Sequence, residues 1–295
     1  MTAMTQKPLS LCDYQLISQL SFVAKRRIAG LVTGEQRSPV SGGGIEFADY
    51  REYQPGDDVR QIDWAVFLRL RRLLVKLCAE EKELTVMLLL DNSLSMQYGE
   101  PEKLRVAYLV TTLLAGVAIQ DGNRVGVLAM GTKLNQVLAP ERGQASLANV
   151  IRAIDGLQPA AAVDPVGCVR EFATLYGRKC MVVLLSDLLY PEWPQVIKGL
   201  AASGCEGYVV QVLCPAELHP EPLGEVTLVD SETAEEIPLH IGMDQTSAYR
   251  RELAKYLKEV RGACHRLGLG NTMISSDTPL ARILNHDLRQ GGLLC

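Results

Sequence analysis

Oxygen-bearing side chains occur at alternate positions directly after a run of apolar residues. Asp91, Ser93 and Ser95 follow the run LTVMLLL, and a second carboxylate, Asp187, follows the run CMVVLLS. Carboxylate and hydroxyl oxygens are the hard ligands that Mg²⁺ and similar divalent cations bind, with water completing an octahedral shell. The spacing therefore predicts either a divalent-cation site or a polar loop held by its own hydrogen bonds.

These side chains can meet only if the two apolar runs are neighbouring strands. Runs of this length that are apolar throughout are typical of parallel strands covered on both faces. In an open doubly wound sheet, ligands bind beyond the carboxyl ends of the central strands, where the strand order reverses. We therefore expect both runs to end at that edge and to bring Asp91 and Asp187 together.

The chain from residue 84 onward alternates between the two kinds of element. The expected strands cover residues 84–90, 124–130, 134–138, 180–186, 207–213 and 271–275, with a hairpin at 225–229 and 236–240. The expected helices cover residues 103–120, 145–154, 165–176, 194–202 and 245–267, with a short one from 279. Such alternation favours parallel pairing with right-handed crossovers. The predicted fold class is α/β, with a doubly wound, mostly parallel sheet.

The first 84 residues have a different pattern, and we expect them to form a smaller α+β region before a domain that spans residues 85–295. A helix is expected at residues 10–32, because apolar positions recur there and cations precede Gly30. Short strands are expected around a turn at Pro55-Gly56.

Composition excludes several classes of protein. Of 295 residues, 30 are basic and 34 are acidic, so no global positive field exists to hold nucleic acid or an anionic membrane. One local stretch, residues 60–76, carries five basic side chains against a single acidic one. It has little of the aromatic interleaving that base stacking needs, so no nucleic acid is expected as a partner.

Location follows from three further features. The longest uncharged stretch has 15 residues, fewer than the roughly 20 that span a bilayer. The first ten residues lack the apolar core of a secretory signal. Eight cysteines without a C-x-x-C pair indicate buried thiols in a reducing compartment. We therefore expect a cytoplasmic protein without a membrane span.

Two sets of residues carry a family resemblance. Asp91, Ser93 and Ser95 with Asp187 resemble the metal-ion-dependent adhesion site (MIDAS) of von Willebrand factor A-type domains. The segment ADYREYQPGDDVRQIDWAVFLRLRRLLVKL is similar to the signature of a bacterial family, domain of unknown function 58 (DUF58). The residues that match this signature are Arg51, Tyr53, Pro55, Gly56, Asp57, Asp58, Arg60, Ile62, Asp63 and Trp64.

The resemblance implies a non-enzymatic protein-interaction module. Its expected partners are a MoxR-type AAA+ ATPase and unknown client proteins, which the pair would mature in a chaperone-like way. At the adhesion site it implies Mg²⁺ or another divalent cation held by the serines and the two aspartates. The family's site also draws on a Thr, but this chain has Val163 at that place, and a methyl group cannot coordinate a cation. The expected site is therefore degenerate, and it would bind a partner through an incomplete metal shell or through hydrogen bonds alone.

The signature segment has two interpretations of its own. Its charged side chains either hold a salt-bridged hairpin or form part of a docking surface. Asp63 and Trp64 stand among apolar residues, which favours the structural interpretation for these two.

A Mg²⁺-dependent phosphoryl-transfer enzyme with Asp91 as nucleophile is the alternative from another class. Haloacid-dehalogenase-type phosphatases also place an Asp after a buried strand, but they resemble D-x-D, and this chain has Ser93 at the second position. The sequence also lacks a G-x-x-x-x-G-K-[ST] phosphate loop. The interaction module is therefore favoured.

Overall fold

The computed structural model describes residues 19–23, 46–55, 57, 59–79, 84–178, 180–221, 224–229 and 236–295. It divides the chain into two compact units. The smaller unit is Lys25–Glu83, and the larger unit combines Met1–Ala24 with Leu84–Cys295.

The N-terminal end of the chain corrects the expected division at residue 84. Leu20 and Phe22 are buried, Phe22 forms a bridge with Leu294, and the amide of Val23 donates to the carbonyl of Leu293. These residues therefore belong to the larger unit, because its core covers their apolar side chains. The helix expected at 10–32 is not formed at residues 19–23, and its other residues lie outside the described part.

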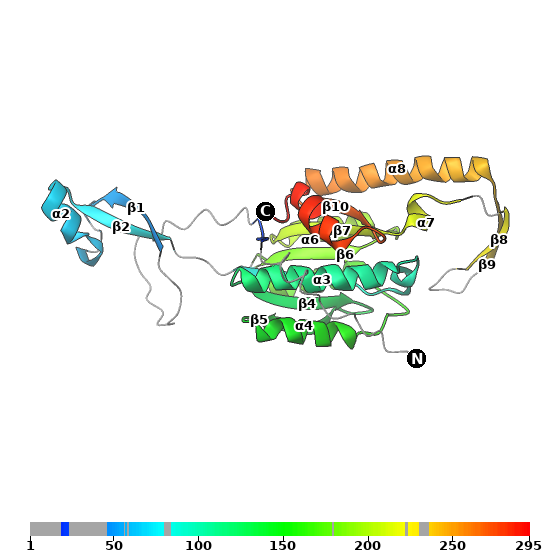
Figure 1. Cartoon of the computed structure of the whole chain (residues 1–295), viewed down its shortest axis with the longest axis horizontal. Helices are drawn as coiled ribbons and strands as arrows, with labels where there is room; N and C mark the ends of the chain where they lie inside the picture. The colour runs from blue at the N-terminus through cyan, green and yellow to red at the C-terminus, as the bar shows by residue number, and fades with distance from the viewer. Residues whose placement is uncertain are drawn as a thin grey trace. The chain divides into compact units, whose positions relative to one another are not determined.

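A six-stranded sheet forms the centre of the larger unit, in the order β10-β7-β6-β3-β4-β5 (Figure 1). Neighbouring strands are parallel except for the antiparallel pair of β4 and β5. The strands are β3 (Thr85–Asp91), β4 (Arg124–Met130), β5 (Asn135–Glu141), β6 (Met181–Ser186), β7 (Glu206–Leu213) and β10 (Gly270–Ser275). The predicted α/β class with a mostly parallel, doubly wound sheet is confirmed.

Strand order reverses at β3, which pairs with β4 on one side and with β6 on the other. Leu90 lies opposite Leu185, so β3 and β6 end almost level with each other. The residues that follow the two strands therefore emerge at the same edge. This is the edge where sheets of this type place their ligands.

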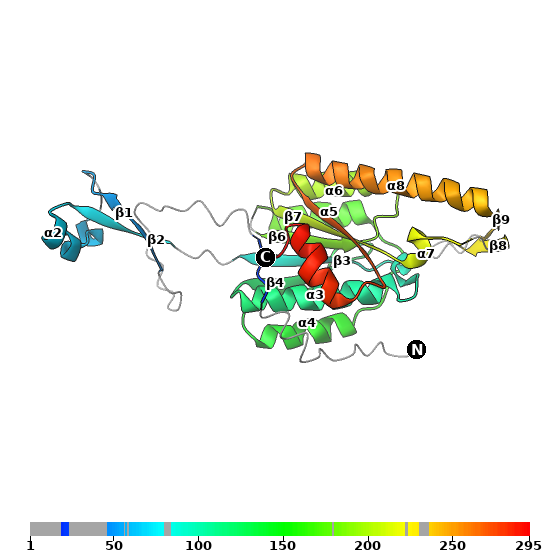
Figure 2. The same cartoon turned by 45° about the horizontal axis from the view of Figure 1, so that its top comes forward.

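Helices cover both faces of the sheet (Figures 1 and 2). One face carries α3 (Lys103–Gln120), α4 (Ala145–Asp155), α9 (Leu280–Arg282) and the π-helical segment Ile283–Leu288. The other face carries α5 (Pro165–Tyr176), α6 (Trp193–Ala202) and α8 (Met243–Arg266). Side chains of β3 alternate between two cores, Leu88 on the α3 face and Leu89 on the other. Because both faces are covered, the strand is apolar at all its inner positions, from Val86 to Leu90.

Helix α3 is the central helix of its face. By length and composition alone it could cross a membrane, but 78% of its apolar window is buried inside the fold. A helix that is hydrophobic all round is expected at such a position. Two strands, β8 (Gly224–Val229) and β9 (Glu236–Ile241), form the expected hairpin, and the short helix α7 (Pro215–Leu218) follows β7.

The smaller unit is an antiparallel pair, β1 (Glu46–Glu52) and β2 (Leu74–Ala79), with a helix between them in sequence. That helix, α2 (Trp64–Leu70), was not predicted, and none of its residues is buried. Ile62 and Val75 are buried and form a bridge that ties the segment before α2 to β2.

Candidate functional site

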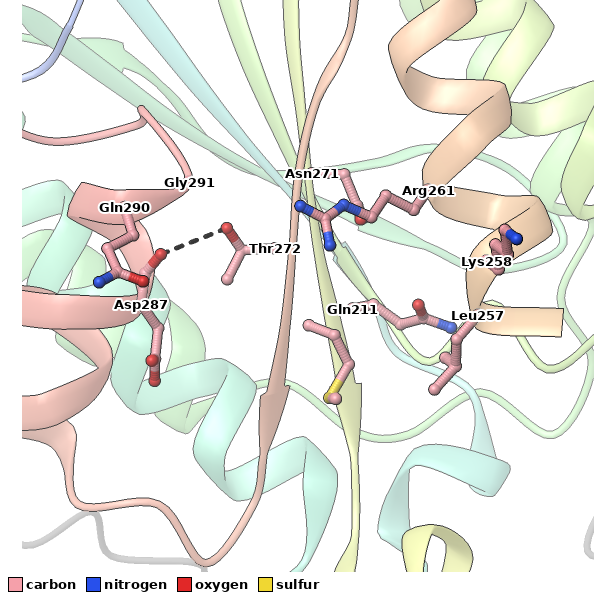
Figure 3. Close-up of a pocket in the computed structure, with 10 residues that line it drawn as sticks. Gln211, Leu257, Lys258, Arg261, Asn271, Thr272, Asp287, Gln290 and Gly291 are labelled. Carbon is pink, nitrogen blue, oxygen red and sulfur yellow. Dashed lines mark hydrogen bonds between the residues drawn. The ribbon is translucent and has the colours of Figure 1, made fainter. Parts of the chain in front are cut away.

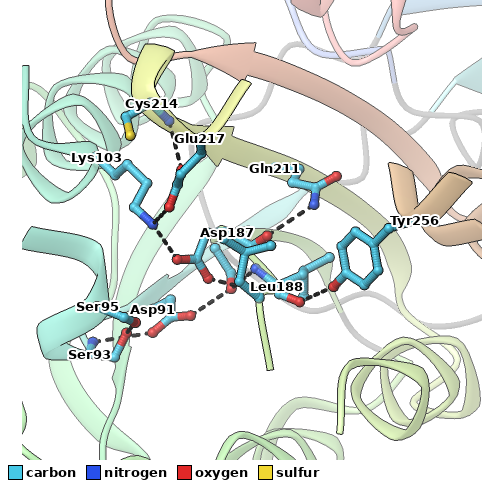
Figure 4. A network of polar contacts seen from close by, with 12 residues as sticks. Asp91, Ser93, Ser95, Lys103, Asp187, Leu188, Gln211, Cys214, Glu217 and Tyr256 are labelled. Carbon is cyan, nitrogen blue, oxygen red and sulfur yellow. Dashed lines mark hydrogen bonds and ion pairs between the residues drawn. The ribbon is translucent and has the colours of Figure 1, made fainter. Parts of the chain in front are cut away.

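Polar side chains gather where β3, β6 and β7 end, at the edge predicted from the sequence (Figure 4). They come from four separate parts of the chain. We call the following six residues the edge cluster: Asp91, Ser93, Ser95, Lys103, Asp187 and Glu217. The structure thus brings together all four residues predicted for the site and adds two that the sequence reasoning missed.

Asp91 is the last residue of β3, and it is only 1% exposed. The hydroxyl of Ser186 donates to its Oδ2 at 2.6 Å, and the backbone amide of Ser93 donates to its Oδ1 at 3.2 Å. Burial, together with the nearby carboxylate of Asp187, raises the pKa of Asp91 to about 6. Asp91 is therefore a buried acid that accepts hydrogen bonds, and no cationic side chain in the described part of the chain forms an ion pair with it.

The loop after Asp91 is held in a fixed turn. The Oγ atoms of Ser93 and Ser95 are 2.8 Å apart, and Ser93 is buried whereas Ser95 is partly exposed. Asn92 anchors the loop, because its side chain accepts from the Tyr108 hydroxyl and donates to the carbonyl of Gln158, both at 2.6 Å. Such contacts preform the loop in the absence of any ligand.

Asp187 contacts a lysine in this structure. The ammonium nitrogen of Lys103 lies 2.6 Å from Asp187 Oδ2 and 2.6 Å from Glu217 Oε1. The side chains of Lys103, Asp187 and Glu217 are 1%, 2% and 10% exposed. Burial alone would lower the pKa of Lys103, but the two carboxylates outweigh it and raise that pKa above its ordinary value. Lys103 is therefore a charged side chain enclosed in the fold.

The sequence does contain features that point to Lys103 and Glu217. Lys103 is the first residue of α3, and the positive end of a helix dipole disfavours a cation there. A lysine at the start of an apolar helix therefore needs a nearby carboxylate. Glu217 lies in α7, the short helix that follows β7, and shares the edge with Asp187; the amide of Cys214 donates to its Oε2 at 2.9 Å.

Val163 does not supply the missing ligand. Its partly buried side chain packs against the core of the α5 face. The neighbouring Asp164 caps α5 instead, because it accepts from the amide of Gly167 at 2.9 Å. No hydroxyl or carboxylate from this loop is therefore directed at the edge cluster.

The donor set does not fit a complete metal-ion-dependent adhesion site. The spacing of Ser93 and Ser95 suits adjacent ligands of a small octahedral ion, which lie about 2.9 Å apart when each is about 2.1 Å from the metal. Asp187, however, is already paired with Lys103, and Val163 carries no donor. Within the described ranges, no group of three or more His, Cys, Asp or Glu is placed to hold a metal ion.

The signature residues lie in the smaller unit, and several of them hold its structure. Arg51 pairs with Asp57 at 2.8 Å, and this pairing lowers the pKa of Asp57. Asp63 caps α2 by accepting from the amides of Ala65 and Val66, and the Tyr50 hydroxyl also donates to it at 2.8 Å. For Asp57 and Asp63 the structural interpretation is therefore supported.

Other signature residues are on the surface or outside the described ranges. Trp64 is 55% exposed, and its ring packs edge-on against the ring of Phe67 with centroids 6.0 Å apart, so its structural role stays a prediction. Arg60 is exposed, and the backbone of Tyr53 donates to the carbonyl of Leu73. The two that fall outside the described ranges are Gly56 and Asp58.

A separate hollow of about 510 Å³ lies along β10 (Figure 3). Lys258 and Arg261 of α8 line one side, and Asp287 and Gln290 of the C-terminal segment line the other. Thr272 donates to the backbone carbonyl of Asp287 across it at 3.4 Å. None of the residues predicted for the site belongs to this hollow.

The parallel sheet, the strand reversal at β3 and the D-x-S-x-S loop at its edge define a von Willebrand factor A-like domain. The chain belongs to the family described as protein of unknown function DUF58, whose model matches residues 49–262. The match thus includes most of the signature segment and the whole edge cluster.

The chain is also similar to individual proteins of other organisms. An uncharacterized protein of Mycobacterium tuberculosis is 28% identical over 268 residues, which are 88% of this chain and 81% of the relative. The structure of an aerotolerance-related membrane protein from Bacteroides fragilis is 15% identical, with a TM-score of 0.43, over 70% of this chain and 99% of that one. The manganese-loaded TRAP protein of Plasmodium vivax is 15% identical, with a TM-score of 0.35, over 44% of this chain and 57% of that one.

Proposed function

We propose that this protein is a non-enzymatic interaction module that binds a MoxR-type AAA+ ATPase through the edge cluster. The pair would act in the cytoplasm on client proteins as a chaperone-like maturation system. Support for the ATPase and its clients comes from the family resemblance of the signature and the edge loop. Support for the edge as the contact comes from the geometry of that loop.

The observation that carries the proposal is the preformed turn after β3. Asp91 and Asn92 are held from both sides by hydrogen bonds, and Ser95 reaches the surface at the end of the turn. A loop that is ordered before binding loses little conformational entropy when a partner docks. Tyr98, four residues after Leu94, is exposed, and its ring adds apolar area beside the loop. This is a degenerate adhesion site that offers hydroxyl and backbone hydrogen bonds.

The same geometry argues against a phosphoryl-transfer enzyme. A nucleophilic Asp91 would need one carboxylate oxygen free to attack phosphorus, but both oxygens accept hydrogen bonds and the residue is buried. Ser93, which stands at the second carboxylate position of D-x-D, cannot act as the acid of such an enzyme at neutral pH. We therefore expect the purified protein to leave a generic phosphate ester unhydrolysed.

A pull-down of the MoxR-type ATPase from the native cell tests the proposal. We expect Ser95→Ala and Asp91→Ala to lower the amount of captured ATPase several-fold. Asp155→Ala, which removes an exposed carboxylate at the end of α4, is the matched control and should capture as much as the wild type. Unchanged capture by a folded Asp91→Ala variant would remove the edge cluster from the mechanism.

A further inference from the structure

We infer that Lys103 is the resident cation of the edge cluster, so that this edge works without a divalent metal ion. Its role in partner binding rests on the proposed function. Its effect on metal binding rests on the geometry of the cluster alone. Lys103 touches no partner, because it is enclosed, and it acts by positioning Asp187 and Glu217.

The first argument is that every carboxylate oxygen around Lys103 already has a donor. Asp187 Oδ2 accepts from Lys103, and its Oδ1 accepts from the amide of Leu189 at 3.0 Å. Glu217 Oε1 accepts from Lys103, and its Oε2 accepts from the amide of Cys214. A metal ion that used Asp187 would have to bind an oxygen that already accepts a hydrogen bond, with the Lys103 ammonium 2.6 Å from that carboxylate.

The second argument is electrostatic. The side chain of Lys103 is 1% exposed, so little water screens its charge from a second cation nearby. A divalent ion beside Asp187 would be repelled by Lys103 in this poorly screened surrounding. Two carboxylates, Asp187 and Glu217, share the Lys103 ammonium, and Asp91 lies near Asp187, so removing Lys103 would leave an anionic cluster.

The third argument is independent of the lysine and concerns the loop before α5. Val163, which by the family resemblance stands where the adhesion site has a Thr, is partly buried and packs against the apolar core. Asp164 is bound to the N-terminus of α5. The missing hydroxyl at Val163 and the pairing of Asp187 with Lys103 therefore both argue against a divalent metal ion at the edge cluster.

Titration of the purified full chain with MnCl₂, followed by the electron paramagnetic resonance of free Mn²⁺, tests the inference. We expect no saturable Mn²⁺ site in the wild type up to about 1 mM, the weak end of divalent-cation sites in proteins. Lys103→Met should bind Mn²⁺ at least about tenfold more tightly than the wild type, because Asp187 and Glu217 lose their counter-ion. Lys198→Met, which removes an exposed lysine of α6, should behave as the wild type.

A second variant keeps the test decisive if Lys103→Met does not fold. Val163→Thr restores the hydroxyl but leaves Lys103 in place, so it should gain no Mn²⁺ binding. A saturable Mn²⁺ site in the wild type that Asp91→Ala abolishes would overturn the inference, as would tight binding by Val163→Thr alone.

Different results would contradict this inference and the proposed function. The Mn²⁺ titration of the purified chain tests the resident-cation role separately from capture, because EDTA in a pull-down would also remove the Mg²⁺ that an ATPase binds with its nucleotide. If no ATPase is captured under any condition, the proposed partner is wrong, but the Mn²⁺ titration still decides the role of Lys103.

Discussion

The two units of this protein each hold an aspartate against a basic side chain, and burial separates the two pairs. Arg51 and Asp57 in the smaller unit have side chains that are 28% and 14% exposed. Lys103 and Asp187 in the larger unit are 1% and 2% exposed. Water competes with the first pair and has almost no access to the second. The ion pair of the smaller unit is therefore expected to contribute little to stability. Breaking the buried pair of the larger unit is expected to destabilise it strongly.

Burial also separates the apolar residues of the two units. The core strands of the larger unit are covered on both faces, whereas α2 of the smaller unit leaves Leu68 71% exposed. The larger unit thus gains its stability from the burial of apolar side chains. The smaller unit depends more on local hydrogen bonds, such as the cap of α2. Four substitutions test this contrast.

Lys103→Met should have the largest effect. Removing one partner of a buried ion pair leaves uncompensated charge in the fold and costs about 3–5 kcal/mol. Urea unfolding of the larger unit measures the loss, with Lys198→Met as control. A loss below about 1 kcal/mol would mean that water reaches the cluster as easily as it reaches the surface.

Asp63→Ala should have a smaller and local effect. The change removes the side chain that caps α2, which is worth about 1 kcal/mol. Hydrogen exchange of the Ala65 and Val66 amides measures it, since both donate to Asp63. Asp63→Asn keeps a capping oxygen and should protect these amides nearly as well as the wild type, and equal loss in both variants would contradict the cap.

Arg51→Ala should have a still smaller effect, and the effect should depend on pH. Arg51 lowers the pKa of Asp57, so the pair stabilises the smaller unit above the ordinary Asp pKa of about 3.9. This contribution disappears as pH falls through the lower pKa of the folded state. Unfolding of wild type and variant should therefore differ at pH 6 and converge in acid, and a difference that persists at low pH would assign Arg51 another role.

Leu68→Ala should have the smallest effect on stability, within about 0.5 kcal/mol, because the side chain is mostly exposed. Leu88→Ala in β3 is the contrasting substitution, with an expected loss of about 2–5 kcal/mol. Thermal unfolding compares the two. A large loss at Leu68 would show that something covers α2 in solution.

Sequence patterns predicted the larger unit well because its elements are long and continuously apolar. The expected bounds of α3, β4 and α5 agree with the structure, and so does the meeting of Asp91 with Asp187. Parallel strands that end at a shared edge make such a meeting predictable from strand order alone. The divalent cation that the sequence pattern suggested for this cluster stays a prediction, and the Mn²⁺ titration tests it.

Two features escaped prediction for physical reasons. Helix α2 mixes apolar and basic residues over only seven positions, so it lacks a clear period, and Asp63 as its cap was the available signal. The contact of Lys103 with Glu217 joins residues that are 114 positions apart. The contact depends on β3, β6 and β7 being neighbours in the sheet, and no local sequence pattern shows that order.

The sequence separation of the Lys103 contacts has a consequence for the lifetime of the folded protein. Lys103 meets Asp187 across 84 residues and Glu217 across 114. The first contact requires β6 to have joined β3, and the second requires β7 to have joined β6 as well. We expect contacts of such long range to form after the rate-limiting step of folding, and interactions of that kind change the unfolding rate while leaving the folding rate nearly unaltered. The buried ammonium is therefore expected to determine how long the folded state persists rather than how quickly it is reached.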